Sequence, residues 1–161
     1  YVVSGWVGKD NGWPGQPANA PRFPLMGWHA LEELRDAGFE IGSHTVTHVR
    51  MQGLPEATCA AELGEAKRTL DDRMQVPVES FAYPYGTHDA GGVAAARRLY
   101  QTAVTTRMAY VRSGADPLQL PRLDTYYLRD TSARDPVFGS TSRIRLRLRA
   151  LMRRARRLGA D

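Results

Sequence analysis

Apolar residues recur with helical spacing in three stretches of the chain. The spacing predicts helices over residues 28–37, 55–74 and 89–100, with Pro77 ending the second and Asp89 in position to cap the third. The apolar positions that carry this pattern are Trp28, Leu31, Leu34, Leu63, Ala66, Leu70, Met74, Val93, Ala96 and Leu99.

Short apolar runs that are typical of strands alternate with these helices. They cover residues 39–42, 78–83, 103–106 and 120–127, and residues 1–3 resemble the end of a further strand. Strands that alternate with helices indicate βα units on a parallel sheet. The sequence therefore predicts an α/β fold whose chemistry gathers at the carboxyl ends of the strands.

The segment over residues 8–27 is rich in Gly, Pro and Asn and predicts a long loop that carries two aromatic residues, Trp13 and Phe23. Long ordered loops in compact domains are often functional. An ordinary surface loop anchored by its aromatic residues explains the pattern equally well.

Length and composition indicate a globular protein with one main domain. The chain has 161 residues, of which 42% are hydrophobic and 24% charged. No apolar run approaches the roughly 18 residues of a membrane-spanning helix. The single cysteine, Cys59, excludes an intrachain disulfide framework and a cysteine zinc cluster. The chain begins at Tyr1 and not at Met, from which we expect it to be part of a longer protein.

Charge divides the chain into two unequal parts. The net charge is +5, yet residues 1–142 sum to −2, whereas residues 143–161 hold eight arginines and one acid. We predict a main domain over residues 1–130, and a linker with an arginine-rich amphipathic helix over residues 131–161. The arginine cluster at 143–157 is a candidate contact to an anionic membrane surface. A nucleic-acid partner is less favoured, because the main part of the chain is not basic.

Two histidines follow the strand predicted at residues 39–42. A Thr-Val-Thr sequence separates His44 from His48, a spacing that lets two imidazoles reach one metal ion. The β-branched residues between them favour a loop or a single turn over a regular helix. The same spacing is also compatible with two solvated histidines in a loop that binds no metal.

A second candidate site is the run Phe-Ala-Tyr-Pro-Tyr-Gly at residues 81–86, at the end of the strand predicted over 78–83. A turn that contains proline at this point can present a backbone N–H to a cleft, where it stabilises negative charge developing on an oxygen. Considered alone, the run is also typical of an ordinary turn with packed tyrosines.

The two elements together closely resemble the polysaccharide deacetylases of the NodB-homology family, the fourth carbohydrate-esterase family. The resemblance rests on residues 38–48, on the Phe-Ala-Tyr-Pro-Tyr-Gly run and on the helices around them. It extends from Tyr1 to about Tyr127.

The resemblance implies a distorted, here incomplete, (β/α) barrel and a metal-dependent hydrolase. Family members remove acetyl groups from glycans that contain N-acetylglucosamine or, less often, from O-acetylated polymers. It implies that His44 and His48, with one aspartate, hold a divalent ion, most often zinc. It also implies that Thr45 steadies their loop and that the backbone N–H of Tyr85 faces the oxyanion. The implied partner is an N-acetylated glycan, and the implied location is the cell envelope or outside the cytoplasm.

The chain departs from the family pattern in its carboxylates. The family's Thr-Phe-Asp-Asp element, which supplies the metal-binding aspartate and the catalytic base, is absent, and Asp71 and Asp72 lie inside a predicted helix. We expect that element to lie upstream of Tyr1 in a longer protein. The 161-residue chain is then expected to be inactive as it stands and to bind metal weakly.

The family's arginine and its general acid also lack obvious counterparts. Ala82 stands where many members have an arginine that pairs with the base, and Arg122 is our candidate to supply that charge. No histidine follows His88, which is itself expected to be a solvated loop residue, and His29 falls inside a predicted helix. The general acid is therefore not assigned.

Three alternatives remain open at this point. The chain could be a glycan-binding barrel without catalysis, or a deacylase of the same superfamily that acts on small amides or cyclic ureides. The arginine tail could instead make it a binder of membrane surfaces or nucleic acid. A solvated terminus without a partner also explains that tail.

Overall fold

The computed structural model describes residues 1–124 and the single positions 144, 148 and 152. The helix predicted for the arginine-rich tail, the boundary predicted at residues 130 and 131, and the last part of the strand predicted over 120–127 lie outside these residues. Among the residues described, no helix has the length and apolarity needed to cross a membrane.

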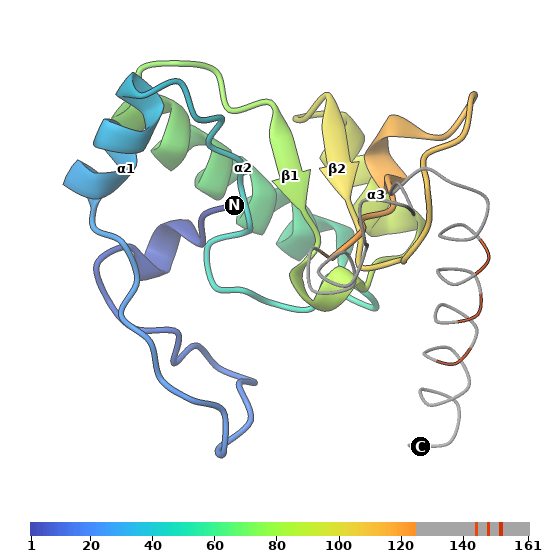
Figure 1. Ribbon diagram of the computed structural model, residues 1–161, viewed down its shortest axis with the longest axis horizontal. Coiled ribbons are helices and arrows are strands. Elements are labelled where there is room, and N and C mark those ends of the chain that lie inside the picture. The colour runs from blue at the N-terminus through green and yellow to red at the C-terminus, as the bar shows by residue number, and fades with distance from the viewer. Residues whose placement is uncertain (125–143, 145–147, 149–151, 153–161) are drawn as a thin grey trace, which may run out of the picture.

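Five segments of the chain line up in parallel, in the order in which they occur in the sequence. At the centre, β1 (Ser80–Ala82) pairs with β2 (Thr102–Val104) (Figure 1). Single parallel bridges extend this small sheet on both sides and join Val2 to Ser43, Ser43 to Phe81, and Val104 to Leu120. Parallel neighbours in chain order are what successive βα units produce, so the predicted α/β fold is confirmed at this level.

The strands are shorter than the sequence predicts. The segment predicted over 39–42 pairs only at its end. The Gly42 carbonyl accepts the Val2 N–H at 2.8 Å, and the following residue, Ser43, donates to the Ser80 carbonyl at 2.8 Å and accepts from the Ala82 N–H at 2.9 Å. The runs predicted over 78–83 and 103–106 shrink to the three residues of β1 and β2. Each segment therefore takes part in the sheet for only a few residues before the chain turns away.

Three helices form where apolar spacing predicts them. They are α1 (Trp28–Asp36), α2 (Glu56–Met74) and α3 (Ala90–Arg97). The carboxylate of Asp89 accepts the Gly92 N–H at 2.9 Å, which confirms the predicted cap of α3. Residues 1–124 also contain three short 3-10 turns: η1 (Ser4–Trp6), η2 (Pro84–Gly86) and η3 (Pro117–Gln119).

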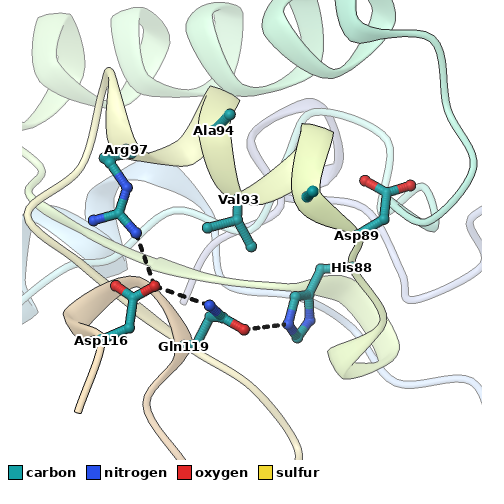
Figure 2. A pocket seen from close by; sticks show the side chains of 8 residues that line it. His88, Asp89, Val93, Ala94, Arg97, Asp116 and Gln119 are labelled. Atoms are coloured by element: carbon teal, nitrogen blue, oxygen red, sulfur yellow. Dashed lines mark hydrogen bonds and ion pairs between the residues drawn. The ribbon is translucent and has the colours of Figure 1, made fainter.

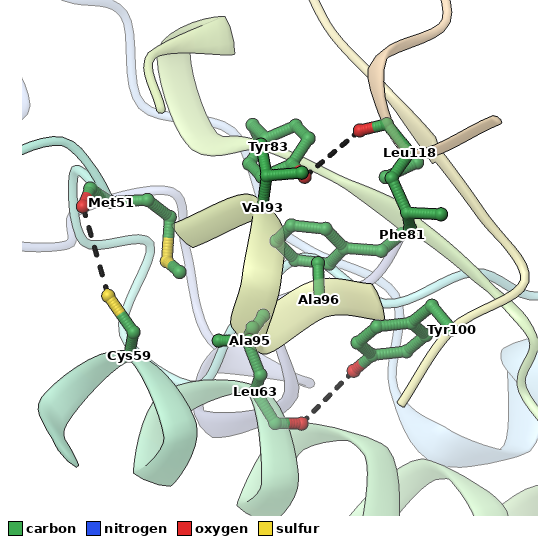
Figure 3. Packing of buried hydrophobic residues seen from close by; sticks show 11 residues of the cluster. Met51, Cys59, Leu63, Phe81, Tyr83, Val93, Ala95, Ala96, Tyr100 and Leu118 are labelled. Atoms are coloured by element: carbon green, nitrogen blue, oxygen red, sulfur yellow. Dashed lines mark hydrogen bonds between the residues drawn. The ribbon is translucent and has the colours of Figure 1, made fainter. Parts of the chain in front are cut away.

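The main core fills the space between the sheet and the helices α2 and α3, which lie on one side of it (Figures 1 and 3). The Phe81 ring lies between those of Tyr83 and Tyr100, with centroids 5.0 and 5.2 Å away. The Tyr83 hydroxyl donates to the Leu118 carbonyl at 3.0 Å, so a buried polar group is satisfied. This core holds β1 rigidly, and the turn that follows β1 carries Tyr85.

Candidate metal and catalytic site

The ends of consecutive parallel segments bring the predicted site residues to one edge of the sheet. His44 directly follows the bridging residue Ser43, Tyr85 lies in η2 just after β1, and Arg122 follows Leu120. The carboxyl ends of parallel strands are where α/β folds gather their functional groups.

The His44 side chain is held by a hydrogen bond to the backbone. Its Nδ1 lies 2.6 Å from the Ala82 carbonyl oxygen. Because a carbonyl oxygen only accepts, Nδ1 carries the proton and Nε2 keeps its lone pair. Burial is the largest cause that lowers the pKa of His44 to about 4, so the ring is neutral at pH 7.

His48 lies beside His44, with the ring centroids 4.8 Å apart. The His48 side chain is buried, and its Nδ1 has no hydrogen-bond partner among the residues described. Burial first, and then the charge of Arg50, lower the pKa of His48 to about 4. The Trp13 ring stacks on the other face of this imidazole, with centroids 4.1 Å apart.

This donor set fits a divalent metal ion in part. Two neutral imidazoles, one with its tautomer fixed by a backbone carbonyl and one with an orphaned buried nitrogen, are the nitrogen ligands that zinc takes. Within the described part of the chain, no group of three His, Cys, Asp or Glu residues is placed to hold a metal. Asp71 is no substitute, since it pairs with Lys67 at 3.1 Å and accepts the Val78 N–H at 2.7 Å.

The loop between the two histidines has an unusual backbone that is held by hydrogen bonds. Thr45 and His48 both have positive φ, at 67° and 62°. The Thr45 hydroxyl accepts the His48 N–H at 3.0 Å, as the family resemblance implies. From α2, the Glu62 carboxylate accepts the N–H groups of Val46 and Thr47 at 2.9 and 3.0 Å.

Tyr85 closes the other side of the site. Its backbone is left-handed, with φ 57°, and its ring centroid lies 4.7 Å from that of His48. The guanidinium of Arg50 lies 3.9 Å from the Tyr85 ring centroid, a cation–π distance. The Tyr85 hydroxyl is buried and finds no partner within residues 1–124. The structure thus brings His44, His48 and Tyr85 into one continuous cluster.

Arg122 lies at the same edge but is engaged with the backbone. Its Nε donates to the Thr105 carbonyl at 2.8 Å. Its positive charge is the last of the causes that lower the pKa of His44, which places it in the electrostatic surroundings of that ring.

The remaining histidines lie apart from this cluster. His29 is exposed on α1 and pairs with Glu33 at 3.5 Å. His88, predicted to be a solvated loop residue, is half-buried: its ring stacks on that of Tyr83, with centroids 4.6 Å apart, and its Nε2 lies 3.3 Å from Gln119 Oε1. His88 lines a groove of about 520 Å³ between α3 and η3. Figure 2 shows its ring directed toward Gln119. Packing against the buried Tyr83 covers one face of the His88 ring.

Sequence reasoning missed two residues of the site. Trp13 was noted as a loop aromatic without a role, and its place in a long loop was the available signal. The sequence indicates a role for Glu62 only weakly. Glu62 lies three residues after Cys59 and four before Ala66, which places its carboxylate next to the buried face of α2. A charge at such a position needs a polar partner.

Comparisons with known proteins identify the family of this chain. A sequence model of the polysaccharide deacetylase family matches residues 1–104. YxkH of Bacillus subtilis (strain 168), which carries a polysaccharide deacetylase name, is 29% identical over 77 residues, or 47% of this chain and 28% of YxkH.

Two solved structures share the fold. BA0330 of Bacillus anthracis, described as a polysaccharide deacetylase, matches with a TM-score of 0.62 and 26% identity over 76% of this chain and 35% of BA0330. The Streptococcus pyogenes deacetylase PplD, solved in complex with acetate, matches with a TM-score of 0.64 and 22% identity over 76% of this chain and 50% of PplD. The chain therefore spans between 28% and 50% of the length of these relatives. Since the family match covers both histidines and the turn that carries Tyr85, the chain belongs to the polysaccharide deacetylase family.

Proposed function

We propose that the chain takes part in metal-dependent hydrolysis that removes acetyl groups from the amides of an N-acetylated polysaccharide, such as a glycan containing N-acetylglucosamine. One observation carries the proposal. Two neutral imidazoles with available nitrogens lie side by side next to Tyr85, at the carboxyl edge of a parallel sheet in a chain of this family.

In this proposal the residues have separate roles. His44 and His48 hold the divalent ion, most often zinc in this family, which acts as a Lewis acid toward a carbonyl oxygen when bound. The Ala82 carbonyl fixes the ring of His44. The backbone N–H of Tyr85 donates to the acetyl oxygen as it gains negative charge. Arg122 adds positive charge at the same edge.

The third metal ligand and the catalytic base come, in this proposal, from sequence outside residues 1–161. Asp71, the nearest sequence candidate, is bound to Lys67 and to the backbone at Val78. An aspartate pair upstream of Tyr1 would supply both functions. Within the described residues, the proposed site has His44 and His48 as its two metal ligands, and no third His, Cys, Asp or Glu joins them.

The metal part of the proposal is tested by adding Zn²⁺ to the chain and following the imidazole resonances by NMR. We expect the resonances of His44 and His48 to shift together. His44→Ala and His48→Ala should each abolish the response, whereas His29→Ala, on the exposed face of α1, should leave it unchanged. A response that survives both single substitutions would remove the metal site from this position.

The hydrolytic part is tested by measuring acetate release from an N-acetylated chitooligosaccharide. We expect no release by the 161-residue chain, and release by a protein extended upstream through an Asp-Asp element. Activity of the 161-residue chain would contradict the missing base. Glycan binding without release by the extended protein would favour a non-catalytic barrel, and release only from small amides would favour a small-amide deacylase.

A further inference from the structure

We propose that Glu62 of α2 is a positioning residue for the metal loop, here defined as residues 44–48. In this role its carboxylate holds the loop in the conformation that presents His44 and His48 to one ion. The inference rests on the proposed metal site and deepens it, because it assigns the residue on which the geometry of that site depends.

Glu62 makes three hydrogen bonds to the metal loop. Its Oε2 accepts the N–H groups of Val46 and Thr47 at 2.9 and 3.0 Å, and its Oε1 accepts the Thr47 hydroxyl at 2.8 Å. Hydrogen bonds to a carboxylate are stronger than those between neutral groups. Both oxygens are therefore engaged with the two residues that lie between Thr45 and His48.

The rest of the loop backbone is held from a different direction. The His44 N–H donates to the Val2 carbonyl at 2.8 Å, and the carbonyls of Thr45 and Val46 each accept a backbone N–H at 3.1 Å, from Ser4 and Gly5. A Cβ on Gly5 would lie 2.7 Å from the Val46 oxygen, so the N-terminal segment, residues 2–5, packs directly against the metal loop. Glu62 thus supplies acceptors for two amides that face away from that segment.

The loop needs such support because its conformation is intrinsically unfavourable. Thr45 is β-branched, yet it has a φ of 67°, and His48 has a φ of 62°. Residues with β-carbons keep left-handed backbones only where the surroundings impose them. With three hydrogen bonds removed, the segment between these two residues can relax, and the spacing of the two imidazoles changes with it.

A second contact from α2 fixes the residue before the loop. The Tyr100 hydroxyl lies 3.0 Å from the carbonyl oxygen of Leu63, to which it donates, and 2.9 Å from the Ser43 hydroxyl. Leu63 is the neighbour of Glu62. One turn of α2 therefore contacts the middle of the loop directly through Glu62, and the residue before the loop through the Tyr100 hydroxyl.

The experiment measures the affinity of the chain for Zn²⁺ by isothermal titration calorimetry, together with the thermal midpoint of the metal-free protein. We expect Glu62→Ala to weaken affinity by about 10- to 100-fold, the range measured for residues that orient metal ligands. Glu62→Gln, which keeps one acceptor oxygen, should lose less. Glu65→Ala, which removes an exposed carboxylate from the same helix, is the matched control and should bind as wild type does.

A readout without metal accompanies the titration. Hydrogen exchange at the Val46 and Thr47 amides should accelerate in Glu62→Ala and stay unchanged in Glu65→Ala. Should Glu62→Ala fail to fold, Thr47→Val removes only the hydroxyl bond and is expected to weaken affinity several-fold.

The outcomes separate this inference from the proposed function. Wild-type affinity in Glu62→Ala overturns the positioning role and leaves the metal site intact, even if the thermal midpoint falls, because Glu62 would then be a purely structural residue. Absence of Zn²⁺ binding in the wild type and in Glu65→Ala overturns the proposed metal site, and the positioning role with it.

Discussion

Backbone strain in this protein is concentrated at the candidate site. Four non-glycine residues among those described have positive φ, and three of them are Thr45, His48 and Tyr85. The fourth, Gln75, ends α2, where a left-handed residue is common. Sparsely populated backbone conformations cluster at functional sites, where the surrounding structure imposes them and they position the functional groups. The distribution therefore supports the same site as the imidazole pair does.

Glycine is required at position 86, beside Tyr85. Gly86 has a φ of 71°, and a Cβ there would lie 2.6 Å from the Thr106 nitrogen. Gly53 has a φ of 79° with open space around it, so it is a matched control for the backbone cost alone. We expect Gly53→Ala to lower the free energy of unfolding by about 1–2 kcal/mol. Gly86→Ala should lower it by roughly 1–3 kcal/mol more, because of the added overlap. Urea denaturation measures both, and equal losses would show that the turn can move aside.

Asp116 is expected to contribute stability that depends on pH. The Leu118 N–H, the Gln119 amide and the Arg97 guanidinium all donate to its carboxylate, and together they lower its pKa from 3.8 to about 2. A carboxyl whose pKa falls on folding stabilises the folded state above pH 3.8, and this contribution is lost as the pH falls toward 2. Asp116→Asn should therefore be less stable than wild type at pH 6.

Denaturation curves at pH 6 and pH 2 test this dependence. The difference between wild type and Asp116→Asn should shrink at pH 2, because the carboxyl is then almost fully protonated in the unfolded chain and about half protonated in the folded protein. Asp36→Asn, which alters an exposed carboxylate paired with the adjacent Arg35, serves as the control. A difference for Asp116→Asn that is the same at both pH values would contradict the assignment.

The residue types of the site could be predicted from the sequence, but their conformations could not. The spacing of His44 and His48 and the Tyr85 turn led to the candidate site through the family resemblance that the two elements carry together. Left-handed backbones are uncommon for residues other than glycine, and for a β-branched or bulky residue such as Thr45 or Tyr85 they are outliers. Contacts from Glu62 in a distant helix help to hold these conformations, and such contacts leave little trace in a single sequence.

At the level of elements, Asp89 is expected to stabilise more than its own helix. One carboxylate oxygen caps α3 through the Gly92 N–H, and the other accepts the Gly53 N–H at 2.7 Å, just before α2. Asp89→Ala should lower the free energy of unfolding by more than the loss of a single cap does, because two backbone donors lose their acceptor. Asp89→Ser, which can keep the cap but not the longer reach to Gly53, should cost less. Thermal or urea denaturation measures the three proteins, and equal stability of all three would contradict the double role.

Helices were easier to predict than strands for a physical reason. α2 has 19 residues, over which the helical period of apolar positions repeats several times. β1 and β2 have three residues each, too few to display the two-residue alternation of a strand. β1 is also buried at all three positions, so it has no polar face to reveal its period.

At the scale of the whole molecule, chain order explains why distant residues meet. Parallel segments in sequence order bring the ends of successive units to one edge, so the closeness of His44 and Tyr85 follows from the predicted βα alternation. The stacking of Trp13 on His48 does not follow from it, because the path of a long loop depends on its own packing. Its position over a candidate metal ligand is known only from the structure.

The uneven charge of the molecule leads to a prediction about membranes. Residues 143–157 contain eight arginines and no acidic residue, whereas residues 1–142 have a net charge of −2. Near an anionic lipid surface each basic residue contributes about 1 kcal/mol, and the contribution falls as salt rises. We therefore expect the chain to sediment with vesicles that contain phosphatidylserine, more weakly at high salt, and not with vesicles of phosphatidylcholine alone.

Deletion of residues 143–161 should abolish sedimentation. Substitution of the arginines by lysine should largely preserve it, because the attraction depends on charge. Sedimentation that survives the deletion, or that is equal for both lipids, would mean that the main domain and not the arginine segment makes the contact.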